Sequence, residues 1–182
     1  MPIQASAILV AAMAIPGGSF ASEGPERAES LLERPEPFAA ALRLRLGADF
    51  RVLRLSIQPG SADADVQDPR APANVDRHTF EDGRLGAPES VQAGRNQRKL
   101  EARLFPFADV DMSMLPRLLA DAARRADTPD ARASHVTVER SEGYGERESW
   151  GRPVVRVVVE GPRGGAVVEY GLTGKHVHTT RW

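Results

Sequence analysis

Three observations predict an α+β fold built from two tandem helix-plus-antiparallel-meander units packed as one body. Short alternating or β-branched segments are separated by Pro-Gly, Asp-Gly and Thr-Gly turns, which is typical of antiparallel strands. A helical pattern precedes each run of strands. The order helix, strand, strand, strand, short strand occurs twice in 182 residues, a length that suits one domain or two small packed units.

The composition narrows the class of protein. Hydrophobic residues make up 41% and charged residues 27% of the chain, a balance that excludes a disordered tail and a polytopic membrane protein. The formal net charge of -1 argues against a general nucleic-acid binder, which needs basic residues to neutralise phosphates. The absence of cysteine excludes disulfides, thiolate metal sites and a cysteine nucleophile.

The first 21 residues predict a signal peptide. Ile3 to Ile15 is almost uninterruptedly apolar but too short to span a bilayer, and small residues at Ser19 and Ala21 suit cleavage after Ala21. No Lys or Arg precedes the apolar run, which leaves the true start codon open. We expect a periplasmic or secreted protein without a membrane span, in which residues 22–36 form a polar leader.

The first unit is expected over residues 37–90. Phe38 to Leu46 fits a helix between Pro37 and Gly47, although its Leu-Arg alternation also fits a strand. The strands of this unit are expected at 50–58, with Leu53, Leu55 and Ile57 on one face, at 62–67, with Asp63 and Asp65 on a solvent face, at 75–80, and briefly from Arg84.

The second unit is expected over residues 112–182, after a connector at 91–111 in which 100–104 alternates like a strand. Leu115, Leu118, Leu119 and Ala122 follow the helical i, i+3, i+4, i+7 pattern, and Ser113 is a candidate N-cap. An antiparallel meander follows, with strands expected at 134–140, 154–160, 166–170 and 175–181.

The turns of the two units resemble each other. Phe80 precedes Asp82-Gly83-Arg84 much as Tyr170 precedes Thr173-Gly174-Lys175. A helix and meander with this punctuation resembles a PepSY-type unit, and two in tandem resemble the β-lactamase-inhibitor-protein fold. The resemblance implies an exported protein that binds another protein, or restrains an enzyme, across a sheet face and its loops. It transfers no inhibitory residue to this chain, and the lack of cysteine departs from disulfide-containing inhibitors of that fold.

The segment 141–152 is the candidate binding loop, because it is long for a hairpin connection and rich in residue types common at interface hot spots. Alternatively, Trp150 anchors the next strand. The Gly-rich turn 161–165 could hold an anion through its arginine, although a plain hairpin is favoured. The partner is expected to be an unidentified envelope or secreted protein. The candidate contact residues are Tyr144, Arg147, Trp150, Arg152 and Arg163.

The sequence supports catalysis and metal binding less than it supports protein binding. The sequence contains no Gly-x-Ser-x-Gly elbow or other catalytic constellation, and no cofactor is expected. His176 and His178 are two residues apart on an expected strand and so share one face, and together with His135 and a carboxylate such as Glu139 or Glu169 they could bind zinc or copper. A half-exposed sheet face is the favoured interpretation. The alternative function is a small-ligand or metal carrier that uses the sheet face or the cleft between units.

Overall fold

The computed structural model describes residues 30–92, 97–141 and 151–182. These ranges contain three α-helices and two 3₁₀ turns, namely α1 (Glu36–Leu46), α2 (Gln97–Arg103), α3 (Leu115–Ala126), η1 (Phe107–Asp109) and η2 (Met112–Met114). The strands are β1 (Arg51–Ile57), β2 (Ser61–Gln67), β3 (Val75–Glu81), β4 (Arg84–Leu85), β5 (Glu89–Val91), β6 (Phe105–Pro106), β7 (Arg132–Arg140), β8 (Pro153–Gly161), β9 (Gly164–Gly171) and β10 (His176–Arg181).

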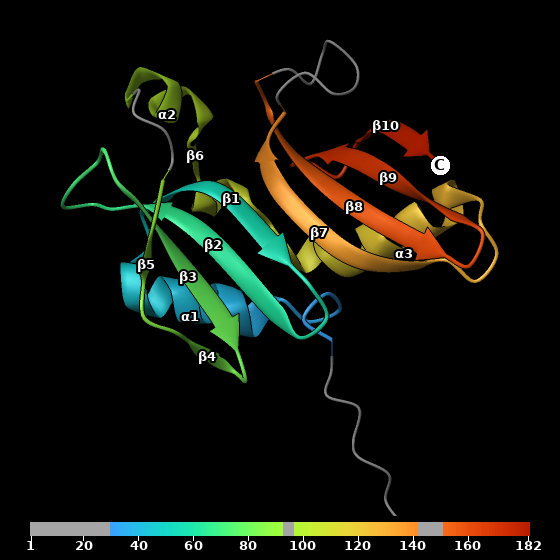
Figure 1. Cartoon of the computed structure of the whole chain (residues 1–182), viewed down its shortest axis with the longest axis horizontal. Coiled ribbons are helices and arrows are strands. Elements are labelled where there is room, and N and C mark those ends of the chain that lie inside the picture. The colour runs from blue at the N-terminus through green and yellow to red at the C-terminus, as the bar shows by residue number, and fades with distance from the viewer. Residues whose placement is uncertain (1–29, 93–96, 142–150) are drawn as a thin grey trace, which may run out of the picture.

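The described strands form one ten-stranded antiparallel sheet (Figure 1). Its main path runs in the order β10-β9-β8-β7-β1-β2-β3-β4, with β5 paired to β3 and β6 paired to β1. The centre of this path is the junction between β1 and β7, where Arg54 lies opposite Glu139 and Ile57 lies opposite Val136. β1, from the first half of the chain, and β7, from the second half, are therefore hydrogen-bonded neighbours.

The predicted fold class is wrong in its division of the chain into two helix-plus-meander units. The β1–β7 pairing makes a single sheet, and one hydrophobic core runs under it from Phe38 and Phe80 to Val157 and Tyr170. The physical reason is that two separate meanders would each leave an unpaired strand edge at β1 and β7, and pairing these edges satisfies both rows of backbone groups. Only the mixed α+β character of the prediction holds.

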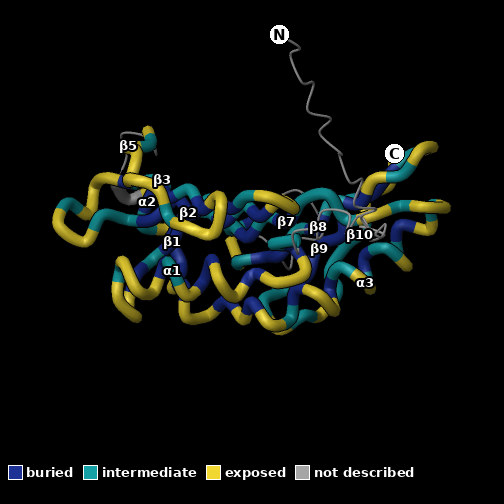
Figure 2. Tube along the Cα trace, turned by 90° about the horizontal axis from the view of Figure 1, so that it is seen from below, coloured by how far each residue is buried: buried dark blue, intermediate teal, exposed yellow. Residues whose placement is uncertain are grey.

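Two helices cover the same face of the sheet. Figure 2 shows α1 and α3 below it, whereas β5 and α2 lie on the other side at one end. The rings of Phe38 on α1 and Phe80 on β3 are 5.9 Å apart between centroids. At the other end, the buried Tyr170 hydroxyl donates to the Asp121 carboxylate over 2.9 Å, which joins β9 to α3. The helix-covered face thus contains the main core.

The two long helices follow from local sequence signals. Phe38 to Leu46 is helical, as favoured, with a proline in its first turn and Gly47 at φ 88° after its end. The amphipathic pattern of 115–126 is confirmed by α3, but Ser113 does not cap that helix. Asp111 instead accepts a hydrogen bond from the Ser113 amide at the start of η2, because a 3₁₀ turn precedes the helix.

A small second hydrophobic core shows that two further predictions are wrong. A β-bulge between Val52 and Arg54 turns Leu53 away from Leu55 and Ile57, which remain in the main core. Leu53 packs instead with Val75, Leu100 and Leu104. The segment expected to be a strand at 100–104 is mostly helix α2, since Leu100 and Leu104 are also four residues apart and so share one helix face.

The predicted C-terminal meander is confirmed by β7 to β10. Gly161 and Gly164 close the turn between β8 and β9. The backbone of Trp182 exchanges hydrogen bonds with Gly165, and the indole lies where a Cβ on Gly165 would collide with it. The last residue of the chain therefore packs on β9 even though 61% of its surface is exposed.

Candidate binding face

The sheet face opposite α1 and α3 carries mostly polar side chains, and we call it the polar face. Its members follow from strand alternation and from the register, which places Arg54 opposite both Asp65 and Glu139, and Ser56 opposite both Asp63 and Thr137. Beyond the end covered by α2 and β5, no described helix lies over it (Figure 2). The charged and hydrogen-bonding residues of the polar face include Arg54, Ser56, Asp63, Asp65, Arg77, Thr79, His135, Thr137, Glu139, Arg156, Glu169 and His178.

An arginine-flanked group lies on β1, β2 and β3. Arg77 donates to both carboxylate oxygens of Asp65, over 2.8 Å from Nε and 3.2 Å from Nη2. Arg54 Nη2 lies 3.2 Å from Asp65 Oδ2 on the other side. The Asp65 side chain is only 5% exposed, whereas those of Arg54 and Arg77 are 43% and 33% exposed. Asp65 is therefore on the expected face but is covered by its two cations and not solvated.

A glutamate-flanked group lies on β7, β8 and β9. Arg156 Nε donates to Glu169 Oε1 over 2.6 Å, and Arg156 Nη1 donates to Glu139 Oε1. Its arginine is more enclosed than the two arginines of the other group, since only 18% of the Arg156 side chain is exposed, and the Glu169 side chain is 6% exposed. Arg156 Nη2 and Glu169 Oε2 are buried without a hydrogen-bond partner among the described residues.

Three uncharged or weakly basic side chains link the two groups across the β1–β7 junction. The His135 Nε2 atom lies 3.1 Å from the Ser56 hydroxyl and 2.9 Å from the Thr137 hydroxyl. Burial lowers the pKa of His135, and the nearby Arg54 guanidinium lowers it further. His135 is therefore held in its neutral form at neutral pH and does not add charge to the junction.

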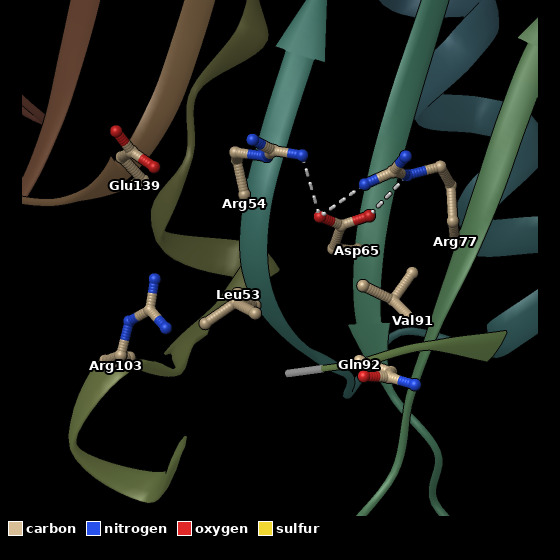
Figure 3. A pocket seen from close by; sticks show the side chains of 8 residues that line it. All are labelled: Leu53, Arg54, Asp65, Arg77, Val91, Gln92, Arg103 and Glu139. Atoms are coloured by element: carbon tan, nitrogen blue, oxygen red, sulfur yellow. Dashed lines mark hydrogen bonds and ion pairs between the residues drawn. The ribbon is translucent and has the colours of Figure 1, made fainter. Parts of the chain in front are cut away.

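A shallow pocket opens beside the arginine-flanked group (Figure 3). Its volume is about 260 Å³. Leu53 and Val91 supply apolar lining, and the Arg54 and Arg77 guanidinium groups stand on either side of Asp65 in Figure 3. Gln92, Arg103 from the end of α2 and Glu139 from β7 complete the lining. The pocket lining therefore combines two apolar side chains and one amide with three arginines and two carboxylates.

The histidines predicted as metal ligands do not converge. A β-bulge at Val177 places His176 opposite Tyr170 and His178 opposite Glu169, so their side chains leave opposite faces of the sheet. His135 lies on β7, with two strands between it and β10. In the ranges that the structure describes, no three His, Asp or Glu side chains are placed to hold a metal ion. The regular alternation assumed for His-x-His is thus wrong.

The structure describes two of the five predicted contact residues, Arg152 and Arg163. Tyr144, Arg147 and Trp150 lie outside the described residues, as do the signal peptide and most of the polar leader. Arg152 and Arg163 are both exposed, but they lie at opposite ends of β8. Nine residues of strand at about 3.3 Å each separate them by roughly 30 Å. The structure therefore does not gather Arg152 and Arg163 into one site.

The polar-face groups were missed as a site by sequence reasoning. Each charged member occupies an outward position of its strand, and a clue is visible in Arg54, Asp65 and Arg77, which alternate in sign from strand to strand. Only the register places them side by side, because a slip of one residue would turn a whole strand over.

Comparison with known proteins adds a fold relationship. No protein-family model and no curated protein matches the sequence. A solved structure of a protein from Clostridium difficile 630, described as a "putative lipoprotein", is similar with a TM-score of 0.55 and 8% sequence identity. The match covers 85% of this chain and 99% of that chain. At this identity the similarity shows a shared fold alone, and the resemblance to PepSY-type units stays a prediction.

The described helices are also informative about membranes. None of α1, α2 and α3 is long and apolar enough to cross a bilayer.

Proposed function

We propose that this chain is an exported, non-catalytic binding protein that takes a protein partner from the envelope or the extracellular medium on its polar face. The observation that carries the proposal is the ordered row of cross-strand charges on a sheet face that no described helix covers along most of its length. Export is supported by the apolar segment at 3–15 and the small residues before position 22.

The dimensions of the row favour a protein over a small ligand. Arg77, Asp65, Arg54, Glu139, Arg156 and Glu169 occupy six neighbouring strands. At about 4.8 Å per strand, the row is roughly 24 Å wide. Most small molecules are recognised in concave, mainly apolar cavities, whereas protein interfaces commonly combine flat polar area with a few anchoring side chains.

The ion pairs also reduce the cost of binding. A free arginine on a surface loses side-chain entropy when a partner orders it. Arg77 already donates two hydrogen bonds to Asp65. Arg156 already donates one hydrogen bond to Glu169 and one to Glu139. A partner with complementary charges therefore meets side chains that are largely in place.

The test uses the cysteine-free sequence. Thr137→Cys places one thiol in the centre of the polar face, and Ala120→Cys places one on the exposed side of α3. Each variant, expressed with its own leader and purified from the envelope, is coupled to a bulky maleimide-polyethylene glycol and used to capture partners from the same fraction.

We expect a stoichiometric partner to be captured by both unlabelled variants and by labelled Ala120→Cys, but not by labelled Thr137→Cys. Capture that survives the label at position 137 would place the contact elsewhere and contradict the proposal. Turnover of a substrate by the purified protein would replace a binding role with a catalytic one.

A further inference from the structure

The two edges of the described sheet differ in how well they are protected. One edge consists of the short strands β4 and β5, with Pro88 in the segment between them. The other edge is β10, which has six residues and no proline and lies beyond β9 at the outer end of the sheet (Figure 1). An unpaired row of backbone N–H and C=O groups is a template for a further strand, and short strands and prolines are common protections. The β10 edge is therefore the more open of the two.

The outward backbone groups of β10 follow from its pairing with β9. Trp182 and Gly165 exchange two hydrogen bonds, with N to O distances of 3.1 and 3.2 Å. Bonded and non-bonded pairs alternate in an antiparallel ladder, so Arg181 and Thr179, at the first and third positions before Trp182, belong to non-bonded pairs. The N–H and C=O groups of Thr179 and Arg181 therefore point away from β9, toward the open edge.

The side chains of these two residues leave the edge clear. Arg181 Nε donates to the Ala126 carbonyl oxygen over 3.2 Å, and its Nη2 donates to the Arg125 carbonyl oxygen over 2.7 Å. The Thr179 hydroxyl lies 2.9 Å from His176 Nε2 on the same, helix-covered side. The positive charge of Arg181 is thus held at the end of α3, where it neither blocks nor repels an approaching strand.

The regular part of β10 is complementary to itself. The bulge at Val177 leaves residues 178–182 in regular register with β9, and Thr180 is their centre. A two-fold axis at Thr180 places this residue opposite its own copy and Thr179 opposite Arg181 of the second copy. Each of the two Thr179–Arg181 pairs can exchange two backbone hydrogen bonds, which makes four in the whole contact. No two arginines face each other in this register.

Trp182 supplies an apolar contact at each end of the same register. It is 61% exposed and, among the described residues, shares with Leu44 the distinction of being an exposed large hydrophobic side chain. Its indole lies over Gly165 on the side of the polar face. The two-fold register places the indole opposite His178 of the second copy, on the same face, and directly opposite side chains of this kind stabilise a strand pair.

We propose that β10 pairs with β10 of a second copy of this chain, about a two-fold axis at Thr180, and so joins two sheets into one. The inference goes beyond the proposed function and does not depend on it. Because directly opposite residues of paired strands share a face, the two polar faces lie on the same side of the joined sheet. Four hydrogen bonds and two indoles make a contact below the usual size of a stable interface, so we expect a reversible dimer.

A single cysteine in the cysteine-free chain tests the register. Thr180→Cys places the two thiols of the dimer at a non-bonded position, where the Cα atoms are about 4.5 Å apart, within the range of about 4.4–6.8 Å that a disulfide spans. With oxidised glutathione as the oxidant, we expect the disulfide-linked dimer to form at least tenfold faster than for Ala120→Cys, whose thiol is exposed on α3. Equal rates for the two variants would overturn the proposal.

A second pair of variants tests the backbone edge. Thr179→Pro removes an N–H group that points away from β9, and proline is tolerated at such positions of an edge strand. Thr179→Ala, the matched control, loses the hydroxyl contact with His176 but keeps the N–H group. The proteins are expressed with their own leader, purified from the envelope and compared by sedimentation equilibrium. We expect dimers of the unsubstituted protein and of Thr179→Ala, and a dissociation constant at least tenfold larger for Thr179→Pro.

The remaining outcomes are decisive in the other direction. A monomeric mass of the unsubstituted protein at every concentration up to about 1 mM, or a Thr179→Pro dimer as tight as that of Thr179→Ala, overturns the proposal. An envelope protein that is captured by Thr179→Ala and lost by Thr179→Pro, without any dimer, would assign the edge to a strand of a partner instead. If proline displaces β10 from β9, its urea midpoint falls below that of Thr179→Ala, and the cysteine variants then decide.

Discussion

The two charged groups on the polar face have opposite composition and differ in how far their arginines are buried. On β1–β3 a buried aspartate is held between two half-exposed arginines, and on β7–β9 an enclosed arginine is held between two glutamates. The first group adjoins a pocket, and with Asp63 on the same face β1–β3 carry two arginines and two aspartates. The second group has an excess of one negative charge. The formal charge of this sheet face therefore becomes more negative from β1–β3 to β7–β9.

The difference shows which charges are structural and which are available. Glu169 is 6% exposed and forms an ion pair with Arg156, so it depends on that arginine. Arg54 and Arg77 are exposed enough to turn toward water if Asp65 is lost. We therefore expect the glutamate-flanked group to contribute more to stability and the arginine-flanked group more to binding.

The largest effect is expected for Arg156→Met. The substitution leaves the buried Glu169 carboxylate without its described cation, and breaking a buried pair by removing one partner costs about 3–5 kcal/mol. Urea unfolding should show this loss, and the double variant Arg156→Met with Glu169→Leu should recover most of it. If the single variant loses less than about 1 kcal/mol, Glu169 is not dependent on Arg156.

Asp65→Asn should cost less, about 1–2 kcal/mol, because the two arginines that it leaves can be solvated. A stability loss as large as that of Arg156→Met would remove the contrast between the two groups.

Acidification should destabilise the protein through its histidines. Burial lowers the pKa values of His78, His135 and His176 below their ordinary 6.5. The unfolded chain therefore binds more protons than the folded chain between the lowered values and 6.5, and the free energy of unfolding falls as the pH decreases through that range.

His78 should be the largest contributor, because it is 5% exposed and its Nδ1 atom has no partner among the described residues. The Arg45 guanidinium on α1 adds to the lowering of its pKa, while Asp76 opposes it. Each proton taken up only on unfolding contributes a slope of up to about 1.4 kcal/mol per pH unit. Urea unfolding at pH 7.5 and 5.5 should show a smaller difference for His78→Leu, and an unchanged difference would exclude His78 as the cause.

The smallest effect is expected for Arg124→Gln on the helix-covered side. Its ion pair with Asp121 spans 3.0 Å, but 71% of the arginine side chain is exposed and Asp121 also binds Arg125 and Tyr170. Exposed pairs of this kind contribute within about 0.5 kcal/mol. A larger loss of unfolding free energy would mean that ion pairs outside the polar face also contribute strongly to stability.

Much of the local structure was predictable because it depends on near neighbours in the chain. The amphipathic spacing of 115–126 and the turn at Gly161 to Gly164 each act within a few residues. Predictions failed where a bulge or a competing periodicity intervened. Leu53 and His176 changed face through bulges on β1 and β10, and Leu100 with Leu104 satisfied both strand and helix spacing.

The sequence by itself determined the two long helices, most of the strands and the outward positions of the charges. Only the tertiary structure decided that β1 pairs with β7, and this pairing merged the expected units into one sheet and placed Arg54 opposite Glu139. The physical reason is that alternation specifies which face a side chain occupies, whereas the choice of neighbouring strand and its register depends on long-range backbone hydrogen bonding and core packing. The row of charges, and the pocket beside it, exist only through that choice.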